Sequence, residues 1–387
     1  MNICMVSWEF PPRIVGGIAS HCFGLSRSLA AQGCEVHVVT LDFPGAPMEE
    51  QVDGVKVHRV QVEIGHPNFL VWTLLFNHFM EKRVADLNAV FRFEVVHCHD
   101  WLTVPVGVAS KHFLGRPLVA TFHSTERGRT QGLSDPDGYA ISGIEWWGLY
   151  EAKRLITVSH SMADQVCSEY KVPREKVRVI PNGVNPAEYE VSVDRARVRG
   201  RYGLSVHDKL VLFVGRLVPA KGVEYLIDAV PAISKRYPNV RFILVGDGWQ
   251  RKQLEDRAHS TGEGWRVIFA GFLPEGELKE LMHAADVLTV PSVYEPFGIV
   301  AIEGMACGLP VVASSVDGLS EVVQHMKTGV HVYPRSPESI AWGVDQVFSN
   351  ESLAKDIAYN AKQSVLARYN WDSVAKETLS VYREATG

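Results

Sequence analysis

Short runs of Val, Ile and Leu alternate with helical patterns along most of this 387-residue chain. Each run is a few residues long and ends near Gly, Pro or a polar residue, as buried strands do. Between the runs, apolar residues recur three and four positions apart, most clearly at 19–31, 223–236 and 275–285. Strands that alternate with helices form parallel sheets with helices on both faces. The alternation therefore predicts an α/β fold built from doubly wound sheets.

The predicted strands fall into two groups, and a chain of this length is too long for one ordinary core. The first group comprises Ile3–Ser7, Val36–Thr40, Val55–Val62, Val95–His99, Leu118–Phe122, Leu155–Ser159 and Val177–Pro181. The second group comprises Leu210–Gly215, Arg241–Gly246, Val267–Gly271, Val287–Pro291, Pro310–Ala313 and Gly329–Tyr333. Between the groups the pattern lapses in a charged stretch at 194–201. We therefore expect two domains, residues 1–190 and 191–368, with a ligand-binding cleft between them.

Composition and charge exclude several classes of protein. A net charge of −5 argues against non-specific nucleic-acid binding, which needs a basic face. The six cysteines form no CxxC pair, as is typical of reduced cytosolic thiols. The chain begins without a basic segment or a cleavage site. Its most apolar run, at 69–76, is far shorter than the ~20 residues that span a bilayer and allows at most peripheral membrane contact. We expect a soluble cytoplasmic protein.

Two glutamates, Glu295 and Glu303, form the most informative motif. A strand is expected at 287–291, which places Glu295 in the loop after its carboxyl end and Glu303 in the helix that follows. In open α/β sheets, ligands bind in the crevice at this edge. Two carboxylates there, beside free amides at a helix N-terminus, suit a ligand with many hydroxyls and a phosphate. The alternative is that both are solvated glutamates on a helix face.

A basic pair follows the first predicted strand of the second half. Arg216 and Lys221 lie in or beside the loop after that strand, and glycines flank them. A bidentate guanidinium together with a flexible ammonium suits a diphosphate. The alternative is a solvated basic pair, which the strand-end glycines make less attractive.

Glycines follow several other predicted strands. The pair Gly16 and Gly17 allows backbone amides to approach a ligand closely, although its spacing is not that of the GxGxxG dinucleotide fingerprint. Gly246 follows a strand of the second half, at a place where a nucleoside can rest. The amides of Gly318 and Leu319 follow another strand and are expected to hold phosphate oxygens.

The run His97, Cys98, His99 and Asp100 contains metal-ligating residue types, but its geometry argues against a metal site. On a strand, His97 and His99 share one face while Cys98 points away, and no second cluster supplies a separated ligand. We expect His99 and Asp100 to be strand-end polar residues that face the cleft. His123 ends another strand and is either a hydrogen-bond donor at a site or a satisfied structural histidine.

Taken together, these motifs resemble the retaining GT-B glycosyltransferases of family 4, from residue 1 to about residue 371. The most specific part is the glutamate motif, with Pro-Ser before it and Gly-Leu-Pro-Val-Val-Ala-Ser after it. Within the family, the chain is similar to the glycogen-synthase-like α-1,4-glucosyltransferases of bacteria and archaea. The supporting runs are Val-Ser-Trp-Glu-Phe-Pro-Pro at 6–12, His-Cys-His-Asp-Trp at 97–101, His-Ser-Thr-Glu-Arg-Gly at 123–128 and Tyr-Glu-Pro-Phe-Gly at 294–298.

The resemblance implies a GT-B fold of two Rossmann-like domains and a hexosyl transfer with retention at the anomeric carbon. The expected donor is ADP-glucose or UDP-glucose, and the expected acceptor is an α-glucan or another hydroxyl compound. By this resemblance Arg216 and Lys221 bind the diphosphate. Glu295 binds the hydroxyls of the transferred sugar, and Glu303 binds the ribose.

The resemblance also implies roles for residues of the first half. His123 contacts the donor sugar, and Asp100 lies towards the acceptor. The donor pocket is expected to be lined by Gly16, Gly17, Gly246, Phe297, Gly298, Gly318 and Leu319. The segment 369–387 is similar to the family's C-terminal helix that crosses back to the first domain. No metal and no cofactor beyond the donor is expected, because no convincing DxD-type carboxylate pair lies beside the diphosphate loop.

One departure from the family pattern concerns the Gly-Gly turn. Glycogen synthases place a lysine two residues before the pair, where this chain has Ile14, and the neighbouring Arg13 is one residue further away. The departure weakens the assignment to glycogen synthase itself more than the assignment to the wider family. The rival functions are a trehalose- or sucrose-type synthase, a lipid- or protein-directed glycosyltransferase, a sugar-nucleotide 2-epimerase and a non-catalytic binding protein. The donor base, the sugar, the acceptor and the oligomeric state stay open as well.

Overall fold

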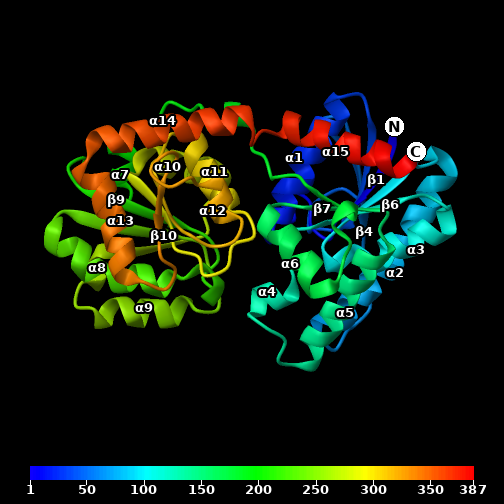
Figure 1. Ribbon diagram of the computed structural model, residues 1–387, viewed down its shortest axis with the longest axis horizontal. Coiled ribbons are helices and arrows are strands. Elements are labelled where there is room, and N and C mark those ends of the chain that lie inside the picture. Colours follow the sequence, from blue (N-terminus) through cyan, green and yellow to red (C-terminus); the bar gives the residue numbers. More distant parts are fainter. The chain divides into compact units, whose positions relative to one another are not determined.

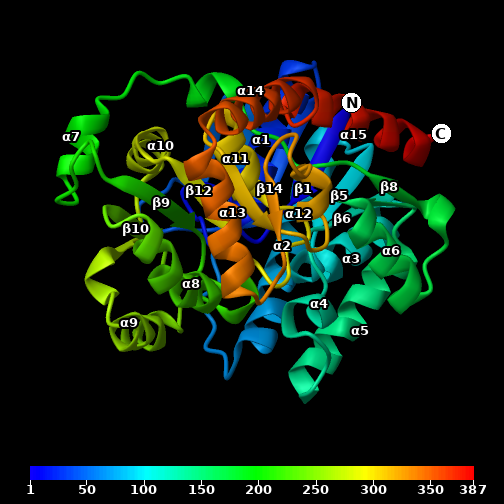
Figure 2. The same ribbon diagram turned by 60° about the vertical axis from the view of Figure 1, so that its left-hand side comes forward.

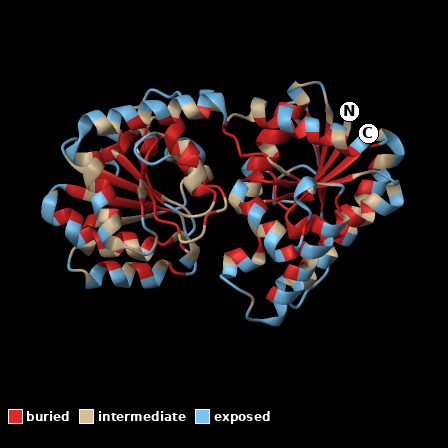
Figure 3. Cartoon of the chain, viewed as in Figure 1, coloured by how far each residue is buried: buried red, intermediate tan, exposed pale blue.

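The computed structural model describes all residues from 1 to 387. It divides into two compact units: unit 1 comprises Met1–Gly183 with Trp371–Gly387, and unit 2 comprises Val184–Asn370. Each unit has its own sheet and its own buried core, as Figures 1 and 3 show. The limits of these units lie a few residues away from the expected domain limits at 190/191 and 368/369. By their contacts, residues 184–190 belong to unit 2.

The sheet of unit 1 has the strand order β3-β4-β2-β1-β5-β6-β7-β8. Its strands are β1 (Asn2–Val6), β2 (Glu35–Leu41), β3 (Glu49–Val52), β4 (Val55–Val60), β5 (Val95–His99), β6 (Leu118–Phe122), β7 (Arg154–Thr157) and β8 (Val177–Val179). All neighbours are parallel except β3 and β4, which form an antiparallel pair at the edge. The order reverses between β1 and β5. This is the topological switch point, where loops leave the strands in opposite directions and make room for a ligand.

Helices cover both faces of this sheet. They are α1 (Gly17–Ala31), α2 (Phe69–Phe91), α3 (Val104–Leu114), α4 (Glu126–Thr130), α5 (Pro136–Glu151), α6 (His160–Tyr170) and α15 (Trp371–Thr386). One core includes Leu25 of α1 and Tyr382 of α15. The other core includes Phe76, Val106 and Met162, from α2, α3 and α6. The last helix of the chain therefore packs in unit 1, beside α1 (Figure 1).

The apolar run at 69–76 is the beginning of the long helix α2. Asn68 caps the helix, and its side chain accepts a hydrogen bond from the amide of Val71 at 2.9 Å. Thr73 and Phe76 are fully buried, whereas Phe69 is exposed. One face of the run therefore belongs to the core. No helix of the structure combines the length and the apolar character needed to cross a membrane.

The sheet of unit 2 has the strand order β11-β10-β9-β12-β13-β14, and all its neighbours are parallel. Its strands are β9 (Lys209–Val214), β10 (Val240–Val245), β11 (Val267–Gly271), β12 (Val287–Val290), β13 (Val311–Ser314) and β14 (Val330–Val332). The order reverses between β9 and β12, which makes this pair the switch point of unit 2. Both units thus have the doubly wound parallel architecture that the alternating pattern predicted.

The helices of unit 2 are α7 (Arg195–Gly200), α8 (Val223–Arg236), α9 (Arg251–Ser260), α10 (Glu275–Ala284), α11 (Ile299–Ala306), α12 (Leu319–Val322), α13 (Pro337–Ser349) and α14 (Glu351–Ala367). In Figures 1 and 2, α8, α9 and α13 lie on one face of the sheet, and α10 and α11 lie on the other. The helix α14 contacts α11 and α13. Buried positions follow the strands and the inward faces of these helices (Figure 3).

The charged stretch at 194–201, where the strand and helix pattern lapses, is a folded part of unit 2. Its residues form α7, and the side chain of Asp194 caps that helix by accepting from the amide of Arg197 at 3.1 Å. Arg199 is only 3% exposed, and its Nη2 donates to Asp286 at 2.8 Å. The charges in this stretch have partners in unit 2, so they hold the segment on the folded unit.

Candidate active site

Lys221 and Glu295 lie together at the switch point of unit 2. Lys221 ends a short 3-10 turn after β9, and Glu295 lies in the loop after β12, the strand that pairs with β9. Nζ of Lys221 donates to Oε2 of Glu295 at 2.5 Å, and Oγ of Ser292 donates to the same oxygen at 3.1 Å. Glu295 is 8% exposed, so its charge is largely removed from water and needs this partner. The structure thus brings together two residues that the sequence assigned separately to a ligand site.

Backbone contacts hold the two loops in place. Two amides of the Glu295 loop donate to the carbonyl of Ala220, at 2.8 and 3.2 Å. Gly222 has a φ of +61°, and a Cβ there would lie 2.1 Å from the carbonyl oxygen of Pro291. Only glycine allows this close approach of the two backbones. The loops that carry Lys221 and Glu295 are therefore held in fixed positions relative to each other.

Arg216 differs from Lys221 in its environment. It follows β9, and its exposed side chain makes no hydrogen bond or ion pair inside the protein. A guanidinium in this state can bind two oxygens of a phosphate at once. The loop after β9 therefore carries one exposed cation and one cation held by a carboxylate.

Glu303 lies on α11, one helix turn or more beyond the Glu295 loop. Its Oε1 accepts a hydrogen bond from the hydroxyl of Tyr189 at 3.3 Å. Burial raises the pKa of Glu303 to about 7, and Tyr189 opposes this shift. Lys279 lies over the Tyr189 ring, with its Nζ 4.7 Å from the centroid. Glu303 is therefore a half-buried carboxyl group with one hydrogen-bond partner, and it is not a freely solvated glutamate.

Other residues expected at the donor pocket have roles inside unit 2. Phe297 is buried and packs edge-on against Tyr369, so its side chain belongs to the core. The amide of Leu319, expected to hold a phosphate oxygen, donates to the carbonyl of Glu295 at 3.3 Å. Gly298 has a φ of +99° directly before α11, whose first amides have no acceptor within the helix. Of these three residues, Gly298 is the one that leaves amides available.

Two further glycines of the expected donor pocket have backbone partners inside unit 2. A Cβ on Gly246 would lie 2.0 Å from the carbonyl oxygen of Gly215, and the Gly246 amide donates to the carbonyl of Gly271 at 2.8 Å. Gly318 precedes the single turn α12, and its carbonyl accepts from the amide of Val322 at 3.2 Å. Contact of either glycine with a nucleoside or a phosphate stays a prediction.

In unit 1, a carboxylate of the protein itself accepts hydrogen bonds from amides at the Gly16–Gly17 turn. Glu9 follows β1 and is 1% exposed, and its Oε2 accepts from the amides of Val15 at 2.6 Å and Gly16 at 2.9 Å. Burial raises the pKa of Glu9, and these amide hydrogen bonds oppose the shift. The Gly16 amide, expected to face a ligand, thus already has a carboxylate partner, while Gly17 is exposed. The sequence analysis missed Glu9 because glutamate is usually solvated.

Arg13 is packed against aromatic rings beside this turn. Its guanidinium carbon lies 5.6 Å from the ring centroids of both Trp8 and Trp72, and its Nη1 donates to the carbonyl of Asp42 at 3.3 Å. Burial lowers the pKa of Arg13, and the charge of Asp42 opposes this effect. Ile14, at the position of the family's lysine, is 54% exposed. In this structure Arg13 is therefore engaged with the two tryptophans.

Asp100 is a buried carboxyl group directly after β5. It is 4% exposed, it has a φ of +55°, and its Oδ1 accepts from the amide of His123 at 2.6 Å. Burial raises the pKa of Asp100 to about 6, and the charge of Arg129 opposes the shift. Arg129 also donates to Ser124 at 2.6 Å and to the buried Glu145 at 3.3 Å. These contacts fix the loop that carries His123.

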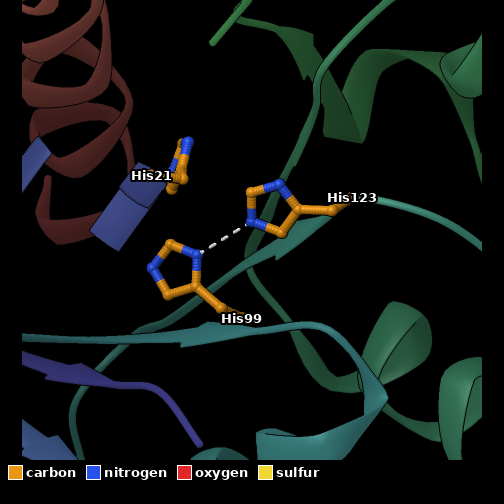
Figure 4. Close-up of side chains that lie close together, drawn as sticks. All are labelled: His21, His99 and His123. Carbon is orange, nitrogen blue, oxygen red and sulfur yellow. Dashed lines mark hydrogen bonds between the residues drawn. The ribbon is translucent and has the colours of Figure 1, made fainter. Parts of the chain in front are cut away.

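His123 belongs to a cluster with His99 and with His21, which the sequence analysis did not single out. Figure 4 shows the three rings close together, with His99 and His123 facing each other. Nδ1 of His99 lies 3.3 Å from Nε2 of His123, and Nδ1 of His21 lies 2.7 Å from Oδ1 of Asn182. Burial lowers the pKa of all three histidines, that of His123 to about 3. The cluster therefore offers neutral imidazoles to a ligand.

The other members of the histidine-cysteine run lie apart from this cluster. His97 has two hydroxyl partners, with Nδ1 2.7 Å from Tyr382 and Nε2 2.7 Å from Thr121, so it is a satisfied structural histidine. Cys98 is fully buried, and burial raises the pKa of its thiol to about 12. The four consecutive residues of this run therefore do not converge on one point.

The two switch points have different chemical capacities. Unit 2 presents the cations Arg216 and Lys221 with the carboxylate Glu295, a set that can bind an anion and hydroxyl groups. Unit 1 presents neutral imidazoles and buried carboxyl groups, which can form hydrogen bonds with hydroxyl groups. A phosphorylated sugar has both kinds of group.

Two protein families match the chain. Residues 194–364 match the family described as glycosyl transferases group 1, and residues 15–188 match glycosyltransferase family 4. A Methanocaldococcus jannaschii protein described as an uncharacterized glycosyltransferase is 46% identical over 388 residues, which cover 100% of this chain and 98% of that protein. A Mycobacterium tuberculosis glycogen synthase is 34% identical over 401 residues, which cover 100% of this chain and 95% of the synthase.

A solved structure supports the same assignment. Sucrose-phosphate synthase from Thermosynechococcus elongatus matches with a TM-score of 0.86 and 27% identity, over 99% of this chain and 98% of that chain. Two doubly wound units with these matches define a glycosyltransferase of the GT-B fold. More particularly, the chain belongs to glycosyltransferase family 4, with the group 1 family model covering most of unit 2. The resemblance to the GT-B glycosyltransferases of family 4 is confirmed.

Proposed function

We propose that this glycosyltransferase moves a hexose, with glucose as the expected sugar, from a nucleoside diphosphate sugar to a glucan or another hydroxyl acceptor. The proposed transfer retains the configuration at the anomeric carbon. ADP-glucose and UDP-glucose are the proposed donors. The observation that carries the proposal is the set of Lys221, Glu295 and Arg216 at the switch point of unit 2.

The proposed chemistry assigns that set to the diphosphate and the sugar. Breaking the bond between sugar and phosphate leaves an additional negative charge on the diphosphate. Arg216 and Lys221 stabilise this charge as it develops, and fixed charges of this kind lower a barrier without reorganisation. Glu295 accepts hydrogen bonds from hydroxyls of the transferred sugar, and Glu303 accepts from those of the ribose. Loss of Lys221 would also leave the buried Glu295 without its cation.

Residues of unit 1 have complementary roles in the proposal. His123 contacts the transferred sugar, and Asp100 lies towards the acceptor. The buried network of Arg129 and Glu145 holds the loop of His123 in position. In the proposed mechanism the leaving phosphate accepts the proton of the acceptor hydroxyl on the same face of the sugar, which keeps the anomeric configuration.

The similarity to a glycogen synthase supports a glucan acceptor, and the similarity to sucrose-phosphate synthase favours a second candidate. In that second candidate the acceptor is a small sugar phosphate. The two candidates share the donor site and differ only in the acceptor. The same experiment can therefore separate them.

The test is a panel of nucleoside diphosphate sugars, with release of free nucleoside diphosphate as the readout. Each donor is incubated alone, with maltooligosaccharides and with small sugar phosphates. The proposal predicts release that depends on a maltooligosaccharide, together with longer glucan chains. Release only with a sugar phosphate would select the second candidate. Conversion of a donor without any acceptor would identify an epimerase and contradict the proposal.

A further inference from the structure

Three histidines from separate elements of unit 1 meet at one point. His21 lies on α1, His99 ends β5, and His123 follows β6. One ring nitrogen of each lies within 4.8 Å of those of the other two, and Figure 4 shows the three side chains close together. We propose that His21, His99 and His123 form a binding site for a divalent transition-metal ion, with Zn²⁺ as the expected ion.

The environment of His21 leaves one nitrogen ready for a metal. Because the carbonyl oxygen Oδ1 of Asn182 can only accept, Nδ1 of His21 carries the proton of their 2.7 Å hydrogen bond. The lone pair of the neutral ring is then on Nε2, which is buried and has no hydrogen-bond partner. Metal-binding histidines are usually oriented in this way, through a hydrogen bond from the nitrogen that does not bind the metal.

The spacing of His99 and His123 also fits a shared ion. Their facing nitrogens are 3.3 Å apart, which is longer than the common 2.9–3.0 Å of hydrogen bonds donated by N–H. Two nitrogens at about 2.0–2.1 Å from a tetrahedral Zn²⁺ are separated by roughly 3.3 Å. The buried Nε2 of His21, which has no hydrogen-bond partner, is the third nitrogen of the site. Buried polar atoms without partners are uncommon, and each needs an explanation.

Charge and ligand type favour a borderline transition metal. Three neutral imidazoles suit Zn²⁺, Co²⁺ or Cu²⁺, whereas Mg²⁺ and Ca²⁺ prefer oxygen ligands. The carboxyl group of Asp100 accepts from the His123 amide and can offset part of the charge of a dication. A site with three protein ligands keeps its fourth position open for water or another ligand. This site differs from the run at 97–100 considered from the sequence, because only His99 belongs to both.

The test uses the full chain, stripped of metal with a chelator and titrated with Co²⁺ and then with Zn²⁺. The visible absorption bands of bound Co²⁺ indicate its coordination geometry and are strong for tetrahedral sites. We expect one ion per chain, tetrahedral cobalt bands without a thiolate band in the near ultraviolet, and displacement of cobalt by Zn²⁺. No sugar donor is present, so the result is independent of the proposed transferase activity.

Variants identify the ligands. Replacing a ligand, as in His21→Ala or His99→Ala, is expected to weaken Zn²⁺ binding by more than ~100-fold, because removal of a supporting partner alone costs 10–100-fold. Asn182→Ala, which changes only the partner of His21, is expected to weaken binding by about 10–100-fold. The exposed His207→Ala serves as the matched control and should bind as the wild type does. Circular dichroism confirms that each variant is folded.

Several outcomes would overturn the proposal. They are the absence of Zn²⁺ binding by the wild-type chain, a thiolate band that assigns the ion to a cysteine, and unchanged binding in the folded Asn182 and His99 variants. Binding that His207→Ala weakens as much as His99→Ala does would place the ion elsewhere.

Discussion

The switch points of the two units occupy corresponding places in their sheets but carry opposite chemistry. In unit 2, the loop after the first strand presents the exposed Arg216 and the ion-paired Lys221. In unit 1, the carboxylate of Glu9, which follows the first strand, accepts hydrogen bonds from two amides of its own loop. A phosphate would be attracted to the first loop and repelled by the second. The comparison shows that the topology fixes where a ligand can bind, while individual side chains decide which part of it binds there.

The largest expected difference between the units concerns two arginines. We expect Arg216→Ala to lower transferase turnover by about 10²–10³-fold, because it removes a charge aimed at the leaving diphosphate. Its thermal stability should stay near the wild-type value, since the side chain of Arg216 has no partner inside the protein. Steady-state release of nucleoside diphosphate and thermal unfolding measure the two effects.

Arg13→Ala is the matched variant in unit 1. It removes packing against Trp8 and Trp72 and is expected to destabilise the fold by roughly 1–2 kcal/mol. Its effect on turnover should be less than about 10-fold, since Arg13 is not assigned to the diphosphate. Equal losses of turnover in the two variants would break the contrast between the units.

Two glycines provide the next comparison. Gly222→Ala in unit 2 places a Cβ 2.1 Å from a backbone oxygen and is expected to cost about 3 kcal/mol or more. Gly33→Ala in unit 1 has a similar φ, +86°, but meets nothing within 4 Å, and is expected to cost only about 1 kcal/mol. Chemical denaturation measures both. A cost at Gly222 no larger than that at Gly33 would show that the loops of Lys221 and Glu295 are not rigidly held.

The smallest expected effect concerns pH and Glu303. Its pKa is about 7 in the folded chain and near 4.5 as a free group, so the folded state binds its proton more tightly. Stability from this group is therefore present at low pH and is lost as the pH rises from about 4.5 to about 7. We expect Glu303→Gln to flatten this decline by roughly 1–2 kcal/mol, allowing for its partial exposure.

The control for this pH experiment is Glu277→Gln, at an exposed position of α10. Thermal unfolding is followed across the same pH range for both variants and the wild type. If Glu303→Gln and Glu277→Gln follow the same pH profile, the burial of Glu303 does not affect its protonation.

Much of the fold is predictable because parallel strands buried on both faces are continuous apolar runs. The pattern predicts every strand of both sheets except β3, whose residues Glu49–Val52 are mainly polar. It pairs with one neighbour only and carries charged side chains, as edge strands often do. A search for apolar runs does not find such a strand. The partners of the charged stretch at 194–201 are likewise not visible in the sequence, because only the fold brings Asp286 to Arg199.

The candidate site is predictable where polar residues directly follow strands. This criterion finds Lys221 and Glu295, and the structure joins them. It misses Glu9 and His21 because their importance comes from burial, and burial depends on contacts distant in sequence. A polar residue within the apolar pattern of the helix at 19–31 is the available indication for His21. From the sequence, the amides of Gly16 and Leu319 are expected to be free for a ligand. Their acceptors, Glu9 and the carbonyl of Glu295, become visible only in the folded chain.

The most direct test of the account compares Lys221→Ala with Lys235→Ala, which removes an exposed lysine on the neighbouring helix α8. The measurement is release of nucleoside diphosphate from the best donor of the panel, in the presence of its acceptor. The account predicts a loss of at least about 100-fold for Lys221→Ala and wild-type release for Lys235→Ala. Near wild-type release by a folded Lys221→Ala variant would contradict the assignment of the unit 2 switch point to the donor diphosphate.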